Sequence, residues 1–203
     1  MPNPNIPRGI IPVQRLDGSP YNGKANIYNV PASNASSIFI GQPLVATGAS
    51  DANGIPVVTT AVAGATNNIL GPMVGIVDGG EPIVAVTRDL NIFRLASVNQ
   101  YILVADDPDL IFEAQEDSVG GNIAMATAGT KNIDLIAGAG STTTGYSGWM
   151  LDSSTIAVGP TLQMRLLAGV RRANNDMGSG TGVTLSKWLC RINIHSLRSL
   201  TGV

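Results

Sequence analysis

Apolar residues along this chain fall in runs of four to nine positions that are rich in valine, isoleucine and threonine and are separated by glycine or proline. Short β-branched runs bounded by turn residues are typical of strands. No window of about 12 residues free of glycine and proline has the 3.6-residue period of a helix, and only 106–109 suggests a helical turn. The pattern predicts an all-β protein, with strands in the runs 37–40, 55–62, 82–88, 101–104 and 110–112.

The last third of the chain has the clearest alternation of apolar and polar residues. Two runs, 161–166 and 187–195, place apolar side chains at every second position. A period of two residues indicates strands with one buried face. The turn-rich stretch 174–182 between them indicates that the two strands form a long hairpin. We expect these side chains to line the core: Leu162, Met164, Leu166, Trp188, Cys190, Ile192 and Ile194.

The first 35 residues combine proline with apolar side chains. Six prolines interrupt this segment, and a proline-rich backbone cannot pair continuously in a sheet. Its aliphatic side chains are nevertheless too numerous for a solvated tail. We therefore expect residues 1–35 to form an extended arm laid over another surface and residues 36–203 to form a β-sandwich or barrel domain. A disordered leader of which only the end packs is the alternative. The candidate contact residues of the arm are Ile6, Arg8, Ile10, Ile11 and Val13.

The composition limits the classes of function. The chain has 203 residues, of which 44% are hydrophobic, enough to bury a sizeable core. A formal net charge of −2 leaves no basic excess for a phosphate backbone, so we expect no direct nucleic-acid partner. No run approaches the roughly 20 apolar residues of a membrane-spanning helix, and the opening residues lack the apolar core of a signal peptide. We expect neither a membrane partner nor export.

Charged residues make up only 13% of the chain, about half the usual proportion. A surface so poor in charge is typical of a protein partly covered by copies of itself or by another protein. The charges are also unevenly placed, and an acidic and a basic edge on one molecule favour self-association or docking. A solvated loop and a solvated sheet face are the alternative. The acids are Asp106, Asp107, Asp109, Glu113, Glu116 and Asp117, and the bases are Arg165, Arg171, Arg172, Lys187, Arg191 and Arg198.

Catalytic and metal-binding motifs are scarce. The one histidine, His195, falls on the polar face of the last run and is expected to be solvated, whereas the one cysteine, Cys190, is expected to be a small core residue. One histidine and one cysteine cannot supply a typical zinc site. The acids of 106–113 lack the spacing of an EF-hand loop, and the glycine-rich stretches lack the lysine of a phosphate-binding loop. We expect no enzyme activity, no metal and no cofactor.

Two sets of segments resemble structural proteins of phage heads. The first set, 41–46, 54–58 and 70–77, has the sequences GQPLVA, GIPVV and LGPMVGIV and resembles the β-rich modules of capsid decoration proteins from tailed bacteriophages. The second, 140–152 and 187–193, has the sequences GSTTTGYSGWMLD and KWLCRIN and resembles the C-terminal half of podovirus head cement proteins. These are turn-and-strand patterns rather than catalytic motifs. The N-terminal arm lies outside the resemblance.

The resemblance implies a structural protein of the virion, with a jelly roll or related barrel as its fold. Proteins of this kind bind the outer surface of the capsid and clamp neighbouring capsomers of the major capsid protein. They act as symmetric oligomers, here a homodimer in preference to a homotrimer. Synthesis in the host cytoplasm agrees with a single unpaired cysteine. A carbohydrate-binding jelly-roll module for adhesion is the alternative; it requires exposed aromatic side chains, for which the candidates are Tyr21, Tyr28, Tyr146 and Trp149.

Overall fold

The computed structural model describes residues 3–77, 91–177 and 184–198, so the predicted strand at 82–88 lies outside the described residues. The described residues confirm the all-β class. A four-residue helix, α1, occurs at Met125–Ala128, which the sequence pattern did not indicate, and 106–109 is not helical. The strands are β1 (Ile11–Arg15), β2 (Asn26–Val30), β3 (Pro43–Ser50), β4 (Pro56–Thr60), β5 (Gly71–Ile76), β6 (Gln100–Val104), β7 (Leu110–Gln115), β8 (Asn132–Ile133), β9 (Leu135–Ile136), β10 (Met150–Leu151), β11 (Met164–Gly169) and β12 (Lys187–Ile192).

Five strands within residues 26–104 close into a small barrel, in the order β2-β4-β3-β5-β6. Neighbouring strands run antiparallel except β2 and β4, which pair in parallel through Asn29 and Val57 and so close the barrel. Closure removes the free strand edges that an open sheet would expose. Side chains from all five strands and the adjoining loops form the core: Tyr28, Val30, Ile38, Leu44, Val58, Leu70, Met73, Ile102 and Val104.

The other large sheet has the order β1-β7-β12-β11-β8, and all its neighbouring strands are antiparallel. The predicted C-terminal hairpin is confirmed, because β11 pairs with β12 and places Met164 opposite Ile192 and Leu166 opposite Cys190. Six of the seven predicted core residues of these runs are buried. The exception is Ile194, which lies beyond the end of β12 and is only half-buried.

One face of this sheet forms a core with the short ladder of β9 and β10 and with α1. Phe112 and Trp188 of the sheet belong to the same buried cluster as Leu151 of β10 and Ala128 of α1. The opposite face carries Glu113 of β7 and its neighbours and is only partly covered. The sheet is therefore buried on one side only, as alternation of apolar and polar positions predicts.

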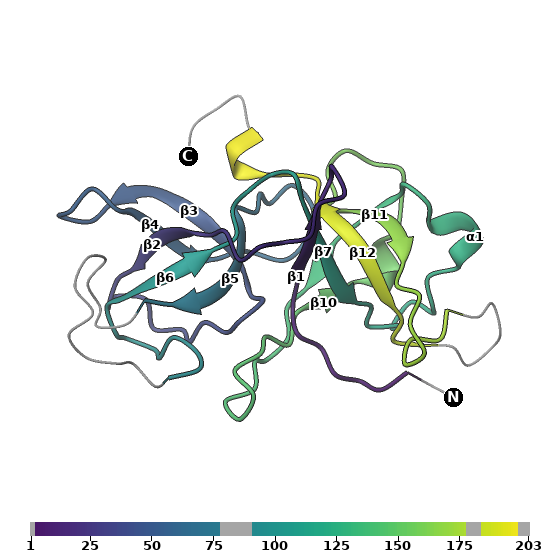
Figure 1. Cartoon of the computed structure of the whole chain (residues 1–203), viewed down its shortest axis with the longest axis horizontal. Coiled ribbons are helices and arrows are strands. Elements are labelled where there is room, and N and C mark those ends of the chain that lie inside the picture. The colour runs from purple at the N-terminus through teal and green to yellow at the C-terminus, as the bar shows by residue number, and fades with distance from the viewer. Residues whose placement is uncertain (1–2, 78–90, 178–183, 199–203) are drawn as a thin grey trace.

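The barrel and the sheet share their packing. In Figure 1 the barrel lies on the left and the sheet on the right, with β1 at their junction. Ala61, Ile69 and Ala105 come from the barrel half of the chain yet belong to the core cluster of the sheet. Backbone hydrogen bonds also join Ile69 to the segment that follows β12: its N–H donates to Ile194, and its carbonyl accepts from Ser196. The two units therefore cannot separate without exposing apolar surface.

The N-terminal segment belongs to this fold, which corrects the expectation of a separate arm followed by a domain that begins at residue 36. Residues 3–10 are extended, as expected, but β1 is an outer strand of the sheet and β2 is one of the five strands of the barrel. Ile10 is fully buried in the core cluster of the sheet. Proline is compatible with β1 because Pro12 lies in an outer strand of the sheet, next to an irregularity in the register between Pro12 and Gln14.

Two glycines allow the N-terminal segment to cross the start of the barrel. Gly9 and Gly41 have positive φ values of 72° and 82°, a region that other residues enter at a cost. A Cβ on Gly9 would overlap the carbonyl oxygen of Gly41, and a Cβ on Gly41 would overlap the carbonyl oxygen of Arg8. The N–H of Ile10 donates to the Gly41 carbonyl over 2.9 Å. The crossing therefore requires glycine on both sides.

Buried polar side chains fix the loops around these cores. The Gln163 side chain donates to the carbonyls of Val62 and Asn67 and accepts from the N–H groups of Gly64 and Leu135. Because Gln163 is fully buried, each of these bonds compensates a group that has lost its water. The residue thereby joins the loop after β4 to β9.

Arg94 has an equivalent role beside the barrel. Its fully buried guanidinium donates to the carbonyls of Pro31, Asn34, Ser36 and Val98. No carboxylate in the described parts of the chain pairs with it, and burial lowers its pKa. Its hydrogen bonds hold the 31–36 loop against the segment before β6.

The glycine crossing gives a stability test with a matched control. We expect Gly41→Ala to lower the free energy of unfolding by roughly 2–5 kcal/mol, from left-handed strain plus backbone overlap. Gly18→Ala has the same kind of strain, at φ 87°, but nothing lies within 4 Å of its new Cβ, so its loss should be about 1 kcal/mol. Chemical unfolding of both variants measures the difference. Equal losses would contradict a close approach at Gly41.

The assignment of the buried face of β12 has its own test. Trp188 is 2% exposed, so Trp188→Ala should cost about 3–5 kcal/mol of unfolding free energy. Leu197→Ala, at a side chain that is 59% exposed, should cost less than about 0.5 kcal/mol. A loss below about 1 kcal/mol for Trp188→Ala would mean that this face is not in the core.

Candidate functional site

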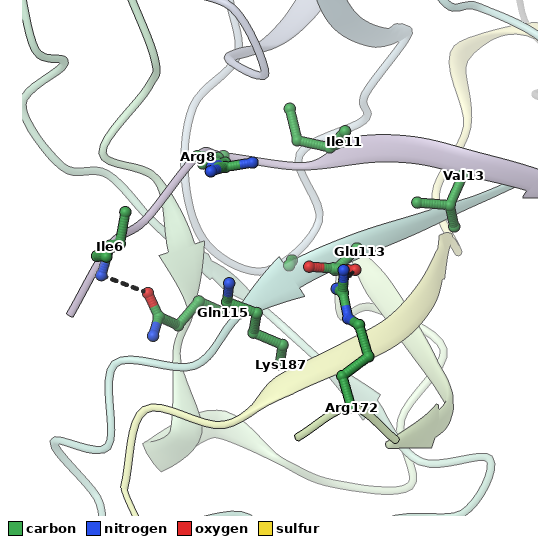
Figure 2. A pocket seen from close by; sticks show the side chains of 10 residues that line it. Ile6, Arg8, Ile11, Val13, Glu113, Gln115, Arg172 and Lys187 are labelled. Atoms are coloured by element: carbon green, nitrogen blue, oxygen red, sulfur yellow. Dashed lines mark hydrogen bonds and ion pairs between the residues drawn. The ribbon is translucent and has the colours of Figure 1, made fainter. Parts of the chain in front are cut away.

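A small groove separates the N-terminal segment from the outer face of the sheet, with a volume of about 170 Å³. Residues 6–9 and β1 form one wall, while β7 and the beginning of β12 form the floor and the other wall. Figure 2 shows the aliphatic and charged side chains that surround it. We call this site the N-terminal groove; it is lined by Ile6, Arg8, Gly9, Ile11, Val13, Glu113, Ala114, Gln115, Arg172 and Lys187.

Two buried amides hold the outer wall of the N-terminal groove in place. Gln115 accepts from the N–H of Ile6 over 3.1 Å, as Figure 2 shows, and donates to the carbonyls of Pro4 and Leu185. Asn3 donates to the carbonyl of Asp176 and accepts from the same residue's N–H. Because Asn3 and Gln115 are 7% and 3% exposed, these bonds form in a desolvated setting, and the wall is fixed by the chain itself.

Cations outnumber acids in the N-terminal groove. Arg172 forms an ion pair with Glu113, and the two lie side by side in Figure 2. The guanidinium of Arg8 lies 5.1 Å from the ring centroid of Tyr146, a cation–π contact. Lys187 is half-buried, and neither Lys187 nor Arg8 has an acidic partner among the described residues. The groove therefore combines apolar walls with two cations that no acid neutralises.

The structure brings four of the five predicted contact residues together in this groove. Ile6 is 53% exposed, Arg8 is exposed, and Ile11 and Val13 are partly exposed. Ile10 is wrong as a contact residue, because its side chain points into the core of the sheet and is fully buried.

The sequence analysis did not single out Gln115. The alternation of residues in β7 could have indicated that Gln115 lies on the outer face of the sheet. It puts Glu113 and Gln115 on the face opposite Phe112 and Ala114. That face accepts polar residues because it is not the face that packs against α1 and β10. The pattern could not show that the N-terminal segment lies across it.

The chain itself pairs with part of each outer edge of the large sheet. The turn after β1 folds back, so that the N–H of Tyr21 donates to the carbonyl of Val13. On the other side, Asn132 of β8 exchanges two backbone hydrogen bonds with Ala157. Since strand addition needs a free edge, a partner cannot add a strand at these positions.

Two of the six acids pair with members of the basic cluster among the described residues: Glu113 with Arg172 and Asp109 with Arg198. A third acid, Asp107, pairs with Arg15, which lies outside that cluster. Asp106 and Glu116 are buried and accept internal hydrogen bonds.

Protein donors take up both carboxylate oxygens of Asp106. Both oxygens of Asp106 accept from Asn26, and one also accepts from the hydroxyl of Tyr28. No group of three or more histidine, cysteine or acidic side chains in the described part of the chain could hold a metal ion. Among the same residues, no helix has the length and apolar character needed to cross a membrane.

His195 is buried rather than solvated, which corrects the expectation from alternation. Strand β12 ends at Ile192, and His195 lies beyond it in a bridge with Ile69 of the barrel half, where it is 3% exposed. The N–H of Leu197 donates to Nδ1, so the neutral ring carries its proton on Nε2, which has no hydrogen-bond partner among the described residues. Burial, followed by the charge of Arg198, lowers the pKa of His195 to about 4.

Cys190 is a core residue, as predicted. Its side chain is fully buried, and burial raises the pKa of its thiol well above the ordinary value. A thiol that stays protonated and inaccessible is a poor nucleophile. Neither Cys190 nor His195 can therefore meet a substrate from solvent in this conformation.

All nine aromatic residues lie within the described residues, and none of them is exposed. Of the four candidates for sugar binding, Tyr28 and Trp149 are 8% and 4% exposed. Tyr21 and Tyr146 are partly covered, Tyr21 by the sheet core and Tyr146 by Arg8. An aromatic platform on which a sugar ring could stack is therefore absent.

Comparison of the chain with protein-family models, with curated proteins and with solved structures gave no match.

His195 gives the stability a pH dependence of definite sign. Below pH 6.5 the unfolded chain binds a proton at this imidazole, whereas the folded chain stays neutral until the pH approaches about 4. Stability should therefore be lost as the pH falls through this window, by about 3 kcal/mol from this group. The charges that act on the ring are Arg198, which lowers the pKa, and Asp106, Asp107 and Asp109, which raise it less than burial lowers it.

The variant His195→Gln keeps an acceptor for the N–H of Leu197 but does not titrate. Unfolding free energies of both proteins, measured by denaturant from pH 7.5 to pH 4, should differ by a constant above pH 7. Below pH 6.5 the unfolding free energy of the variant should rise relative to that of the wild type. Parallel curves throughout would contradict a buried neutral imidazole.

Proposed function

We propose that this chain is a structural protein of a phage virion that binds the outer surface of the head and clamps neighbouring capsomers of the major capsid protein. The observation that carries the proposal is the N-terminal groove. Its volume of about 170 Å³ is below the roughly 300–1,000 Å³ of small-molecule sites. Its apolar walls, and its two cations without an acidic partner among the described residues, suit the side chains of another protein better than a substrate.

Four further features support the same function. The turn-and-strand segments resemble cement and decoration proteins, and only 13% of the residues are charged. The one histidine and the one cysteine are buried, which keeps the thiol nucleophile and the most frequent general base away from solvent. Ten large hydrophobic side chains are exposed among the described residues, which agrees with a surface that partners cover, including a second copy of the chain in a homodimer.

The alternative of a carbohydrate-binding adhesion module receives no support from the arrangement of the aromatic residues. Sugar sites of that kind stack the ring on exposed tyrosine or tryptophan, and the candidates here are buried or covered by other side chains. We therefore retain head binding as the proposed function.

The test is sedimentation with purified DNA-filled heads that lack this protein. We expect the chain to sediment with the heads up to a fixed number of copies per head, because capsomer sites are repeated and finite. Heads emptied of DNA should bind equally well if the outer surface is the site. A protein that stays in the supernatant at micromolar concentration, with either kind of head, would contradict the proposal.

A further inference from the structure

We propose that the N-terminal groove binds a protein segment in which an aliphatic side chain lies next to a glutamate or aspartate, supplied by the shell protein. This inference rests on the proposed function for the source of the segment. The chemistry of the segment follows from the size of the groove, from its charge and from the side chains that line it.

The size of the groove sets the size of the occupant. A cavity of about 150 Å³ lined by apolar side chains can hold a molecule such as benzene, and this groove has about 170 Å³. It therefore accommodates one or two side chains and not the face of a helix. Ile6, Ile11 and Val13 lie on the wall formed by the N-terminal segment and supply the surface on which an aliphatic side chain loses water.

The charges of the groove select a carboxylate beside that aliphatic group. Glu113 is neutralised by Arg172, which leaves Lys187 and Arg8 as cations without acids among the described residues. Figure 2 shows both on the rim of the same site. Since Lys187 is half-buried, a carboxylate next to it is less screened than on an open surface. A basic segment would meet repulsion at the same positions.

The fixed walls make the groove a site formed before binding. Asn3 and Gln115 hold the N-terminal segment through buried hydrogen bonds. Because this segment is already ordered, binding a partner costs little further conformational entropy in the groove. The groove itself is lined mainly by side chains. Recognition in it should therefore depend on the identity of the partner's side chains, and neutralising the carboxylate should weaken binding measurably.

The first experiment uses three synthetic peptides as probes of the full chain. The test peptide is acetyl-Ser-Val-Glu-Leu-Ser-amide; one control replaces Glu with Gln, and the other replaces both aliphatic residues with Ala. In ¹⁵N NMR titrations we expect the test peptide to shift the amide signals of Ile11, Gln115 and Lys187. Each control should bind roughly three- to tenfold more weakly. Equal binding of the Gln peptide, or shifts confined to other parts of the protein, would overturn the inference.

The second experiment reverses one charge in the groove. Lys187→Glu should abolish the shifts caused by the test peptide, whereas Lys24→Glu, the same change at an exposed lysine outside the groove, should leave them unchanged. Because Lys187 lies at the beginning of β12, unfolding by denaturant serves as a check that the variant is folded. Arg8→Glu, in the extended segment, provides a second reversal outside the strands. Binding by both reversed variants at the strength of the wild type would overturn the inference.

Sedimentation with heads separates this inference from the proposed function. If the wild type sediments with heads and Lys187→Glu and Arg8→Glu do so less, while Lys24→Glu does not differ, both are supported. If all four proteins sediment equally, the head-binding function holds and the groove is not its contact. If the test peptide binds in the groove but no protein sediments with heads, the segment chemistry holds and the proposed function fails.

Discussion

The close approach of Gly9 and Gly41 is the contact on which the rest of this structure depends. At this point the backbone of the N-terminal segment passes over the beginning of the barrel at a separation that excludes any Cβ. The next residue, Ile10, then enters the core of the large sheet, and β1 continues as its edge. One crossing therefore joins the first residues, the barrel and the sheet. Gly9 is also one of the residues that line the N-terminal groove.

The alternation of residues predicted the C-terminal half of the sheet well because its strands have one buried face. Trp188, Cys190 and Ile192 are buried as a set, and register along β11 and β12 follows from that. The same pattern wrongly predicted a solvated His195, because the alternation of apolar and polar residues continues in the sequence beyond Ile192, where the strand ends. There the chain turns to pair with Ile69 of the barrel half, and burial is decided by that long-range contact rather than by strand periodicity.

The N-terminal segment was harder to predict for a different reason. Proline argues against a central strand, but it has little effect on an edge strand, and the sequence does not say which strand lies at an edge. Pro12 occupies such a position in β1. The sequence likewise marked the charges of the candidate site without indicating that Glu113 would meet Arg172. That pairing joins β7 to the segment that follows β11, 59 residues further along the chain.

A closed barrel and a sheet whose outer edges pair in part with the chain itself favour side chains and loops as the means of binding a partner. We infer that the N-terminal segment is a structural part of the core and that its outer side, at the N-terminal groove, is the docking surface. Native-state hydrogen exchange at Ile10 tests that claim most directly, because its N–H bonds to Gly41. We expect this amide to be protected as strongly as those of β7 and β12. Exchange as fast as at Thr143, in an exposed turn, would contradict the account.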